Sequence, residues 1–141
     1  MSEPIFHSEW DAIDKQSITT ESDIVRVRQL VRFHSKEAGL GIVDQTRITT
    51  AASELFRNMF QYAEGGEVSI HIGLFEDKRA FIITCIDEGP GIENLDQAMS
   101  DGYTSGKGMG YGLPGAKRLV DNFYITSNPG EGTTIRIMKW I

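Results

Sequence analysis

The stretch EVSIHIGLFEDKRAFIITCID, residues 67–87, contains two apolar runs separated by a short polar segment. In the first run, over 67–76, apolar and polar residues alternate with the period of a half-buried β-strand. The second run, 80–87, is more continuously apolar, which predicts a more central strand, and DKR at 77–79 is the expected hairpin turn. Strands joined by so short a turn run antiparallel, so the sheet is predicted to be largely antiparallel.

Two helical patterns precede this hairpin. The first lies within 19–39, and its apolar stripe is formed by Ile24, Val27, Leu30, Val31 and His34. The second is predicted to begin at Asp44 and to end near Ala63, with a stripe formed by Ile48, Ala52, Leu55, Met59 and Tyr62. We expect the basic residues of the first helix (Arg26, Arg28 and Arg32) to form a solvated face, with partner binding as the alternative.

The rest of the chain completes the sheet. Residues 4–15 are a candidate edge strand, and 88–108 form a long loop with one short helix at 95–99. A third helix is expected at 113–121, followed by two strands, NFYITSN and GTTIRIMKW, joined by PGEG. Paired strands and grouped helices indicate an α+β fold with the helices on one face of the sheet.

Length and composition limit the possible functions. With 141 residues, the chain is predicted to form a single domain, 1–141. Lys and Arg number 14 against 20 Asp and Glu, a net charge of −6, which argues against nucleic acid as a partner. The single cysteine, Cys85, is expected to be a small buried residue on a strand. The sequence shows neither a signal peptide nor an apolar run long enough to cross a membrane, so we expect a cytoplasmic protein.

Three motifs carry possible chemistry, and the first is ELFRNMFQYA, residues 54–63. Glu54 and Asn58 are four residues apart and therefore share one face of the second helix. A carboxylate and a carboxamide are hard oxygen donors, suited to Mg²⁺ and to proton abstraction. The alternative is a polar pair on a solvated helix face.

The second motif is CIDEGPGI, residues 85–92. Asp87 closes an apolar strand, where its carboxylate can accept a hydrogen bond from an exocyclic amine. Gly89 and Gly91 would allow the backbone to approach a flat ring closely. The alternative is that the segment is simply a turn, since its residues suit one.

The third motif is GKGMGYGLPGAKRL, residues 106–119. Its alternating glycines precede a helix expected to begin at Leu113, so backbone N–H groups could surround a triphosphate, and Lys107 could add a charge. The alternative is a flexible loop whose glycines assist the helix start. The spacing differs from a Walker A loop, and no strand leads directly into it as a dinucleotide-binding fold requires.

Together, and in this order, the motifs resemble the GHKL (Bergerat-fold) ATPase superfamily over about residues 20–140. ELFRNMFQYA is similar to the N box, DEGPGI to the G1 box, the glycine stretch to the ATP lid with the G2 box, and GEGTTIRI to the late Gly-Thr strand. The string from Asp101 to Trp140 resembles the RsbT-type switch kinases of bacterial stressosomes. The resemblance implies an α/β sandwich with a mixed, mainly antiparallel sheet.

The resemblance also implies roles for individual residues, with ATP and Mg²⁺ as the cofactors. Asn58 would coordinate Mg²⁺, and Glu54 would orient or deprotonate the attacking hydroxyl. Asp87 would bind the adenine amine, supported by Thr133, and Gly89 and Gly91 would shape the pocket. Backbone N–H groups would contact the phosphates at Gly108, Met109, Gly110, Gly112 and Leu113, in a lid that closes over ATP.

At the level of function, the resemblance implies a serine/threonine kinase that phosphorylates a STAS-domain protein. Once released, such a kinase would bind and activate a PP2C-type phosphatase. The alternative is a nucleotide-gated anti-sigma factor that acts mainly by sequestering its partner.

Overall fold

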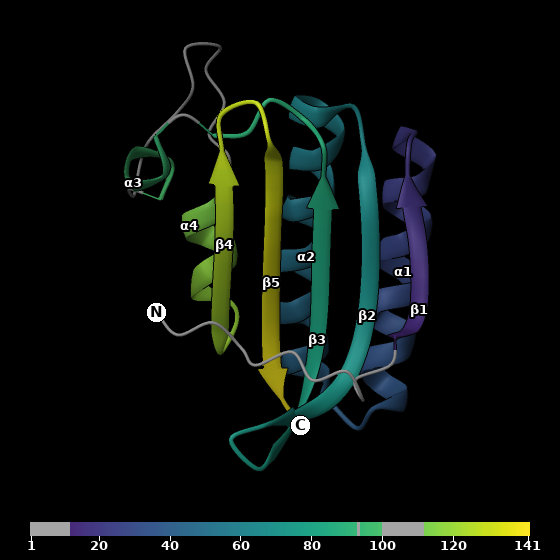
Figure 1. The fold of residues 1–141 in the computed structure, drawn as a ribbon. Coiled ribbons are helices and arrows are strands. Elements are labelled where there is room, and N and C mark those ends of the chain that lie inside the picture. Colours follow the sequence, from purple (N-terminus) through teal and green to yellow (C-terminus); the bar gives the residue numbers. More distant parts are fainter. Residues whose placement is uncertain (1–11, 93, 100–111) are drawn as a thin grey trace.

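The computed structural model describes residues 12–92, 94–99 and 112–141. These residues form a five-stranded sheet with the strand order β1-β2-β3-β5-β4 and with helices behind it (Figure 1). The strands are β1 (Ala12–Ile18), β2 (Gly66–Phe75), β3 (Lys78–Asp87), β4 (Asn122–Asn128) and β5 (Gly132–Trp140). All four pairs of neighbouring strands are antiparallel. The predicted α+β fold is confirmed, and within the described ranges its sheet is antiparallel throughout.

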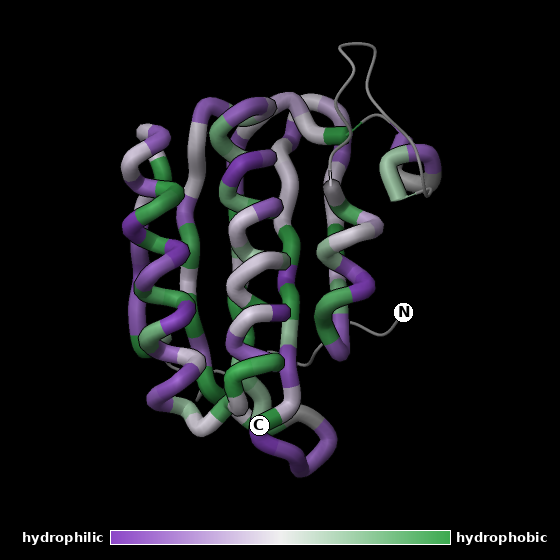
Figure 2. Tube along the Cα trace, turned by 180° about the vertical axis from the view of Figure 1, so that it is seen from behind, coloured by the Kyte–Doolittle hydropathy of each residue, from purple (hydrophilic) through white to green (hydrophobic). Residues whose placement is uncertain are grey.

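The helices are α1 (Glu21–Glu37), α2 (Ile42–Ala63), α3 (Leu95–Ala98) and α4 (Leu113–Arg118). Both helices predicted before the hairpin are confirmed, and they lie side by side on one face of the sheet (Figure 2). A capping box starts α1: the Asp23 N–H donates to the Thr20 hydroxyl oxygen at 3.2 Å, and the Thr20 N–H donates to the Asp23 carboxylate at 3.1 Å. None of the helices in the described part of the chain is long and apolar enough to span a membrane.

The second helix begins two residues earlier than predicted, because Gly41 rather than Asp44 occupies the N-cap position. Asp44 lies in the first turn, where a negative side chain favours the partial positive charge of the helix N-terminus. The sequence pattern pointed to Asp44 because aspartate is also a common N-cap residue.

The β2–β3 hairpin is confirmed, but its turn is shorter than predicted. The register pairs Phe75 with Lys78, so the turn consists of Glu76 and Asp77, and Lys78 and Arg79 already belong to β3. Both turn residues have positive φ, 54° and 67°. That geometry matches the right-handed twist of paired strands and explains a two-residue connection even without a glycine.

Other boundaries also differ from the prediction. The edge strand β1 covers residues 12–18, so the predicted segment 4–15 agrees only over 12–15, and residues 1–11 lie outside the described ranges. The third helix, α4, ends at Arg118 rather than at Asp121. Asp121 instead belongs to the sheet edge, because its N–H donates to the Met138 carbonyl oxygen and its carboxylate accepts the Trp140 N–H. The short helix expected at 95–99 is present as α3.

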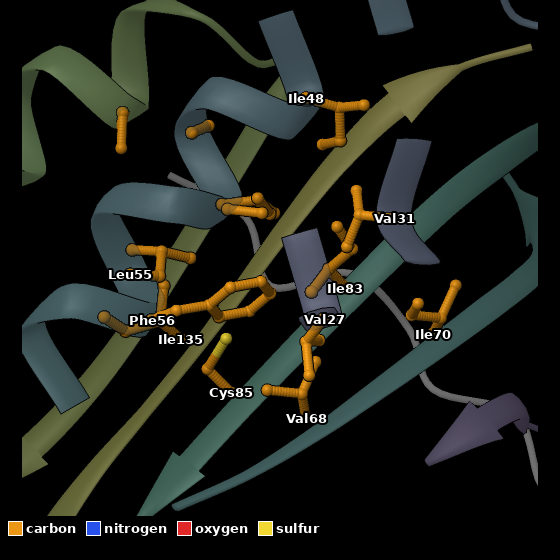
Figure 3. Packing of buried hydrophobic residues seen from close by; sticks show 14 of the residues in the cluster. Val27, Val31, Ile48, Leu55, Phe56, Val68, Ile70, Ile83, Cys85 and Ile135 are labelled. Carbon is orange, nitrogen blue, oxygen red and sulfur yellow. The ribbon is translucent and has the colours of Figure 1, made fainter. Parts of the chain in front are cut away.

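The hydrophobic core fills the space between the helices and the sheet (Figure 3). Val27 and Val31 of α1 and Phe56 of α2 pack over core-facing residues of the strands, including Ile83 and Cys85. Cys85 is 2% exposed, as expected for a small buried residue, and burial raises the pKa of its thiol. The helical stripes and one face of the strands therefore meet in the larger of the two hydrophobic clusters that the described residues form, and Ala80, Ile82 and Met138 form the smaller one.

A buried lysine ties the helical layer to the sheet. The Lys139 side chain is 7% exposed, and its Nζ lies 3.2 Å from Asp44 Oδ1 in α2 and 3.2 Å from Asp121 Oδ2 before β4. A buried ammonium group is tolerated only when paired, so this ion triad fixes the N-terminal end of α2 against β5.

Removing one partner of Lys139 should cost more stability than removing the lysine itself. Asp121→Ala leaves a buried ammonium with a single carboxylate, and we expect a loss of about 1–3 kcal/mol in the free energy of unfolding. Lys139→Met removes the buried charge and should be the milder change. Chemical denaturation measures both variants, with Glu131→Ala in an exposed turn as the control. A larger loss in Lys139→Met would contradict this account.

Candidate active site

A pocket opens between α2, the end of β3, the start of β5 and the start of α4. Its walls are mainly apolar, with four residues whose side chains add polar groups. The apolar part comes from Leu55, Met59, Ala63, Cys85, Pro90, Ile92, Leu113 and Ile135, and the polar side chains are Asn58, Tyr62, Asp87 and Thr133. An apolar slot with few polar groups is typical of a site for a flat organic ligand.

Asp87 is held rigidly at the end of β3. Its Oδ1 accepts the Gly89 N–H at 3.0 Å and the Thr133 N–H at 3.2 Å. Its other oxygen, Oδ2, accepts no hydrogen bond from the residues that the structure describes. One carboxylate oxygen therefore fixes the side chain, and the second is available to a donor in the pocket.

The environment of Asp87 also alters its ionisation. Burial raises the pKa of its carboxyl above the ordinary value, and the hydrogen bonds from Gly89 and Thr133 offset this only in part. Groups with perturbed pKa values in a cleft are candidates for function. A half-buried carboxylate of this kind gains most from a ligand that donates a hydrogen bond to it.

Thr133 connects this site to a residue that the sequence analysis missed. The hydroxyls of Thr133 and Ser127 lie 2.7 Å apart, and Ser127 Oγ also accepts the Ile92 N–H at 2.8 Å. Ser127 thus joins β4, β5 and the loop after Asp87. The alternation along β4, in which Phe123, Ile125 and Ser127 occupy every second position, was the available signal for a polar residue turned toward the core.

Glu54 and Asn58 lie one turn apart on α2 but border different spaces. Asn58 lines the pocket described above, whereas Glu54 lines a neighbouring groove between α1 and α2. Arg57 donates a hydrogen bond to Glu54 Oε1 at 2.8 Å, and the two side chains are 47% and 38% exposed. An exposed pair of this kind adds little stability, so its main effect is to orient the carboxylate.

Gly112 brings the end of the glycine stretch against Glu54. It caps α4 with φ at +69°, and a Cβ added there would stand 2.5 Å from Glu54 Oε2. The left-handed backbone favours glycine here, and a side chain at this position would also displace the Glu54 carboxylate. Gly89 is similarly restricted, because a Cβ there would collide with Ala63 of α2.

The structure brings most of the predicted site residues together. Asn58, Asp87, Gly91, Leu113 and Thr133 line one pocket. Gly89 donates to Asp87, and Glu54 meets Gly112 beside the pocket. Gly108, Met109 and Gly110, together with Lys107 and most of the predicted lid, lie outside the described residues.

Comparison with known proteins gives the same family as the motifs. Residues 43–140 match the family described as histidine kinase-, DNA gyrase B-, and HSP90-like ATPase. This range includes α2, the pocket and the last four strands of the chain, so the match covers all the residues that build the site.

Similarity to individual relatives indicates a branch within this family. The chain is 48% identical over 124 residues to the serine/threonine-protein kinase RsbT of Bacillus subtilis, covering 88% of this chain and 93% of the relative. It is 32% identical over 98 residues to an anti-sigma F factor of a Thermoanaerobacter species, covering 67% and 68%.

A solved structure supports the fold. The RsbU and RsbW domains of Rv1364c from Mycobacterium tuberculosis align with a TM-score of 0.61 at 23% identity, covering 89% of this chain and 32% of that one. At that identity the likeness concerns the fold alone. The family match and the RsbT similarity confirm the predicted resemblance. The chain belongs to the histidine kinase-, DNA gyrase B- and HSP90-like ATPase family and, within it, to the RsbT-type serine/threonine kinases.

Proposed function

We propose that this protein transfers the γ-phosphate of ATP to a serine or threonine of a STAS-domain protein. In this proposal the kinase, once released from that substrate, binds and activates a PP2C-type phosphatase. The observation that carries the proposal is the apolar pocket lined by Asp87 and Asn58, with Glu54 beside it against Gly112. The 48% identity to a named serine/threonine-protein kinase, over nearly its whole length, supports the reaction type.

Asp87 is proposed to bind the adenine ring. Its Oδ2 is available to accept a hydrogen bond from an exocyclic amine, because Oδ1 already accepts two backbone N–H groups. The apolar walls formed by Met59, Ile92 and Ile135 would contact the faces of the ring. Thr133 supports the site through its N–H, which helps to fix Asp87.

Asn58 is proposed to hold Mg²⁺ through its side-chain oxygen. The chemistry of Asn58 fits that ion, because its side chain lines the pocket and carries a hard carboxamide oxygen. Mg²⁺ commonly takes one or two protein oxygens and completes its shell with phosphate oxygens and water. When bound, the ion would neutralise charge on the phosphates. Gly112 and Leu113, with Gly108, Met109 and Gly110, are proposed to donate backbone N–H groups to these phosphates.

Glu54 is proposed as the catalytic residue toward the acceptor hydroxyl. The hydroxyl oxygen bonds to the γ-phosphorus while the bond from that phosphorus to the β–γ bridging oxygen breaks, and ADP leaves. The hydroxyl proton passes to the Glu54 carboxylate, which Arg57 holds in place. Phosphoryl transfer depends chiefly on positioning and charge neutralisation, and these residues supply both.

The second candidate function is that of an anti-sigma factor that acts by sequestering its partner. The 32% identity to an anti-sigma F factor supports this alternative. The two functions differ in one measurable respect. A kinase incubated with Mg²⁺, ATP and a STAS-domain protein yields phosphoserine or phosphothreonine on that protein, detected by mass spectrometry. Stable binding of a sigma factor, with no phosphate transfer to any STAS-domain protein, would favour sequestration instead.

Asp87→Asn should weaken ATP binding by about 10- to 100-fold without weakening the fold. The amide oxygen can still accept from Gly89 and Thr133, but an NH₂ group replaces the free acceptor, and an unmatched buried polar group costs about 1–3 kcal/mol. Because burial raises the pKa of Asp87, its ionised form is disfavoured in the folded state, so the variant should melt at an equal or higher temperature. Calorimetric titration and thermal unfolding test both parts; unchanged affinity would refute the adenine assignment.

ATP binding should also weaken on acidification in a way that Asp87 controls. A protonated carboxyl loses an acceptor for the adenine amine, and burial raises the pKa at which this happens. We therefore expect the affinity to begin falling at a higher pH than an exposed aspartate would give. Titrations between about pH 7.5 and pH 5, where folded proteins tend to be most stable, should show this fall in the wild type and a flatter profile in Asp87→Asn. If the ATP affinities of the wild type and Asp87→Asn fall in parallel as the pH is lowered, the assignment of Asp87 to the adenine amine is contradicted.

Glu54→Gln should reduce the rate of phosphate transfer by about 100-fold or more, the usual contribution of a general base. ATP affinity should change little, because Glu54 lies outside the pocket that holds the ring. Glu37→Gln, at the exposed end of α1, is the matched control. Single-turnover assays at saturating ATP separate transfer from binding, and full transfer by Glu54→Gln would remove it from this role.

A further inference from the structure

A second large hollow lies beside the nucleotide pocket, between α1 and α2. It has a volume of about 440 Å³ and is lined from α1 by Arg28, Gln29 and Arg32, and from α2 by residues that include Ser53, Glu54 and Arg57. We call it the arginine groove. Its lining residues belong to α1 and α2, and these two helices run next to each other on the helical side of the molecule (Figure 2).

The arginine groove carries positive charge that no acidic side chain in the described ranges pairs with at Arg28 or Arg32. Arg28 and Arg32 are exposed and one helical turn apart, and no carboxylate among the residues described here forms an ion pair with either. Arg26, on the same helix, is by contrast bonded to Asp23 and Gln16. Two like charges four positions apart destabilise a helix. Arg28 and Arg32 form such a pair although the chain as a whole has a net charge of −6.

Because Glu54 lines the arginine groove, the acceptor hydroxyl is expected to approach Glu54 from the groove. Asn58 and Leu113 line the nucleotide pocket, whereas Glu54, one turn away from Asn58, lines the arginine groove. A hydroxyl that reaches Glu54 while ATP fills the pocket must therefore come from the side of the groove. The polypeptide on either side of that hydroxyl would then lie along the groove.

From this arrangement we propose that the arginine groove docks an acidic segment of the acceptor protein, next to the serine or threonine that is phosphorylated. This inference rests on the proposed kinase function. Arginine forms paired hydrogen bonds with carboxylates, so Arg28 and Arg32 would select acidic residues near the acceptor. Charge complementarity of this kind also speeds association and is weakened by salt.

The test is charge reversal in the groove. In Arg28→Glu/Arg32→Glu, the kcat/KM for the STAS-domain acceptor should fall at least tenfold, while the Kd for ATP stays within twofold of the wild type. The control is Lys15→Glu/Arg79→Glu, which makes the same charge change at exposed sites on β1 and β3, and it should behave as the wild type. Thermal unfolding checks that both double variants fold.

Two results of that experiment would overturn the inference. If both double variants lose activity equally, the effect belongs to net charge and not to the groove. If the groove variant loses ATP affinity in proportion to its activity, the arginines serve the nucleotide and not the acceptor. A fall in kcat/KM confined to the groove variant, and larger at low ionic strength, supports docking.

A binding measurement tests the docking site even if the protein proves not to be a kinase. The probe is a fluorescent decapeptide rich in glutamate with one central serine, followed by anisotropy without ATP. The wild type and the Lys15→Glu/Arg79→Glu control should bind it in a salt-sensitive manner, and Arg28→Glu/Arg32→Glu should bind at least tenfold more weakly. Absent binding, or equal binding by all three proteins, would refute the docking site. Absent phosphate transfer with intact, groove-dependent binding would refute only the kinase assignment.

Discussion

The packing of α2 across the sheet is the constraint on which the rest of the structure depends. One face of this helix is buried, with Ile48, Leu55 and Phe56 between 0% and 1% exposed. That burial fixes the rotation of the helix, and the rotation in turn sets Asn58 at the pocket and Glu54 at the groove. A rigid helix in a close-packed core holds these two side chains more precisely than a loop could.

In the pocket, the two oxygens of the Asp87 carboxylate have different environments. Oδ1 of Asp87 joins β3 to β5 through Thr133 and orders the following loop through Gly89, and Oδ2 remains for a ligand. Ser127 extends the same network to β4 and to Ile92. The Asp87 carboxylate is thus held by backbone donors from two segments, and the walls around it are mainly apolar side chains that also belong to the core.

Local pattern was sufficient for much of this fold. Alternation predicted β2, a continuous apolar run predicted β3, helical spacing predicted α1 and α2, and Asp87 stood out because a charge ends an apolar strand. The errors fell where tertiary contacts decide: Glu76 and Asp77 form the turn because the strand register requires it, and Asp121 leaves the helix for the sheet edge. The separation of Glu54 from the pocket around Asp87, and the hydrogen-bond network of Ser127, depend on contacts between segments distant in sequence. Such contacts have no short-range signature.

The insertion of β5 between β3 and β4 has a consequence for how the protein is made. Asp87 and Thr133 are 46 positions apart, and the bond between them exists only once β5 has paired with β3. Closing so long a loop is entropically unfavourable and contributes to slow, non-local folding. During synthesis the helices and the β2–β3 hairpin emerge well before β5. The pocket around Asp87 is therefore completed late in folding, because a nascent chain that lacks β5 still lacks Thr133 and Ile135, which line it.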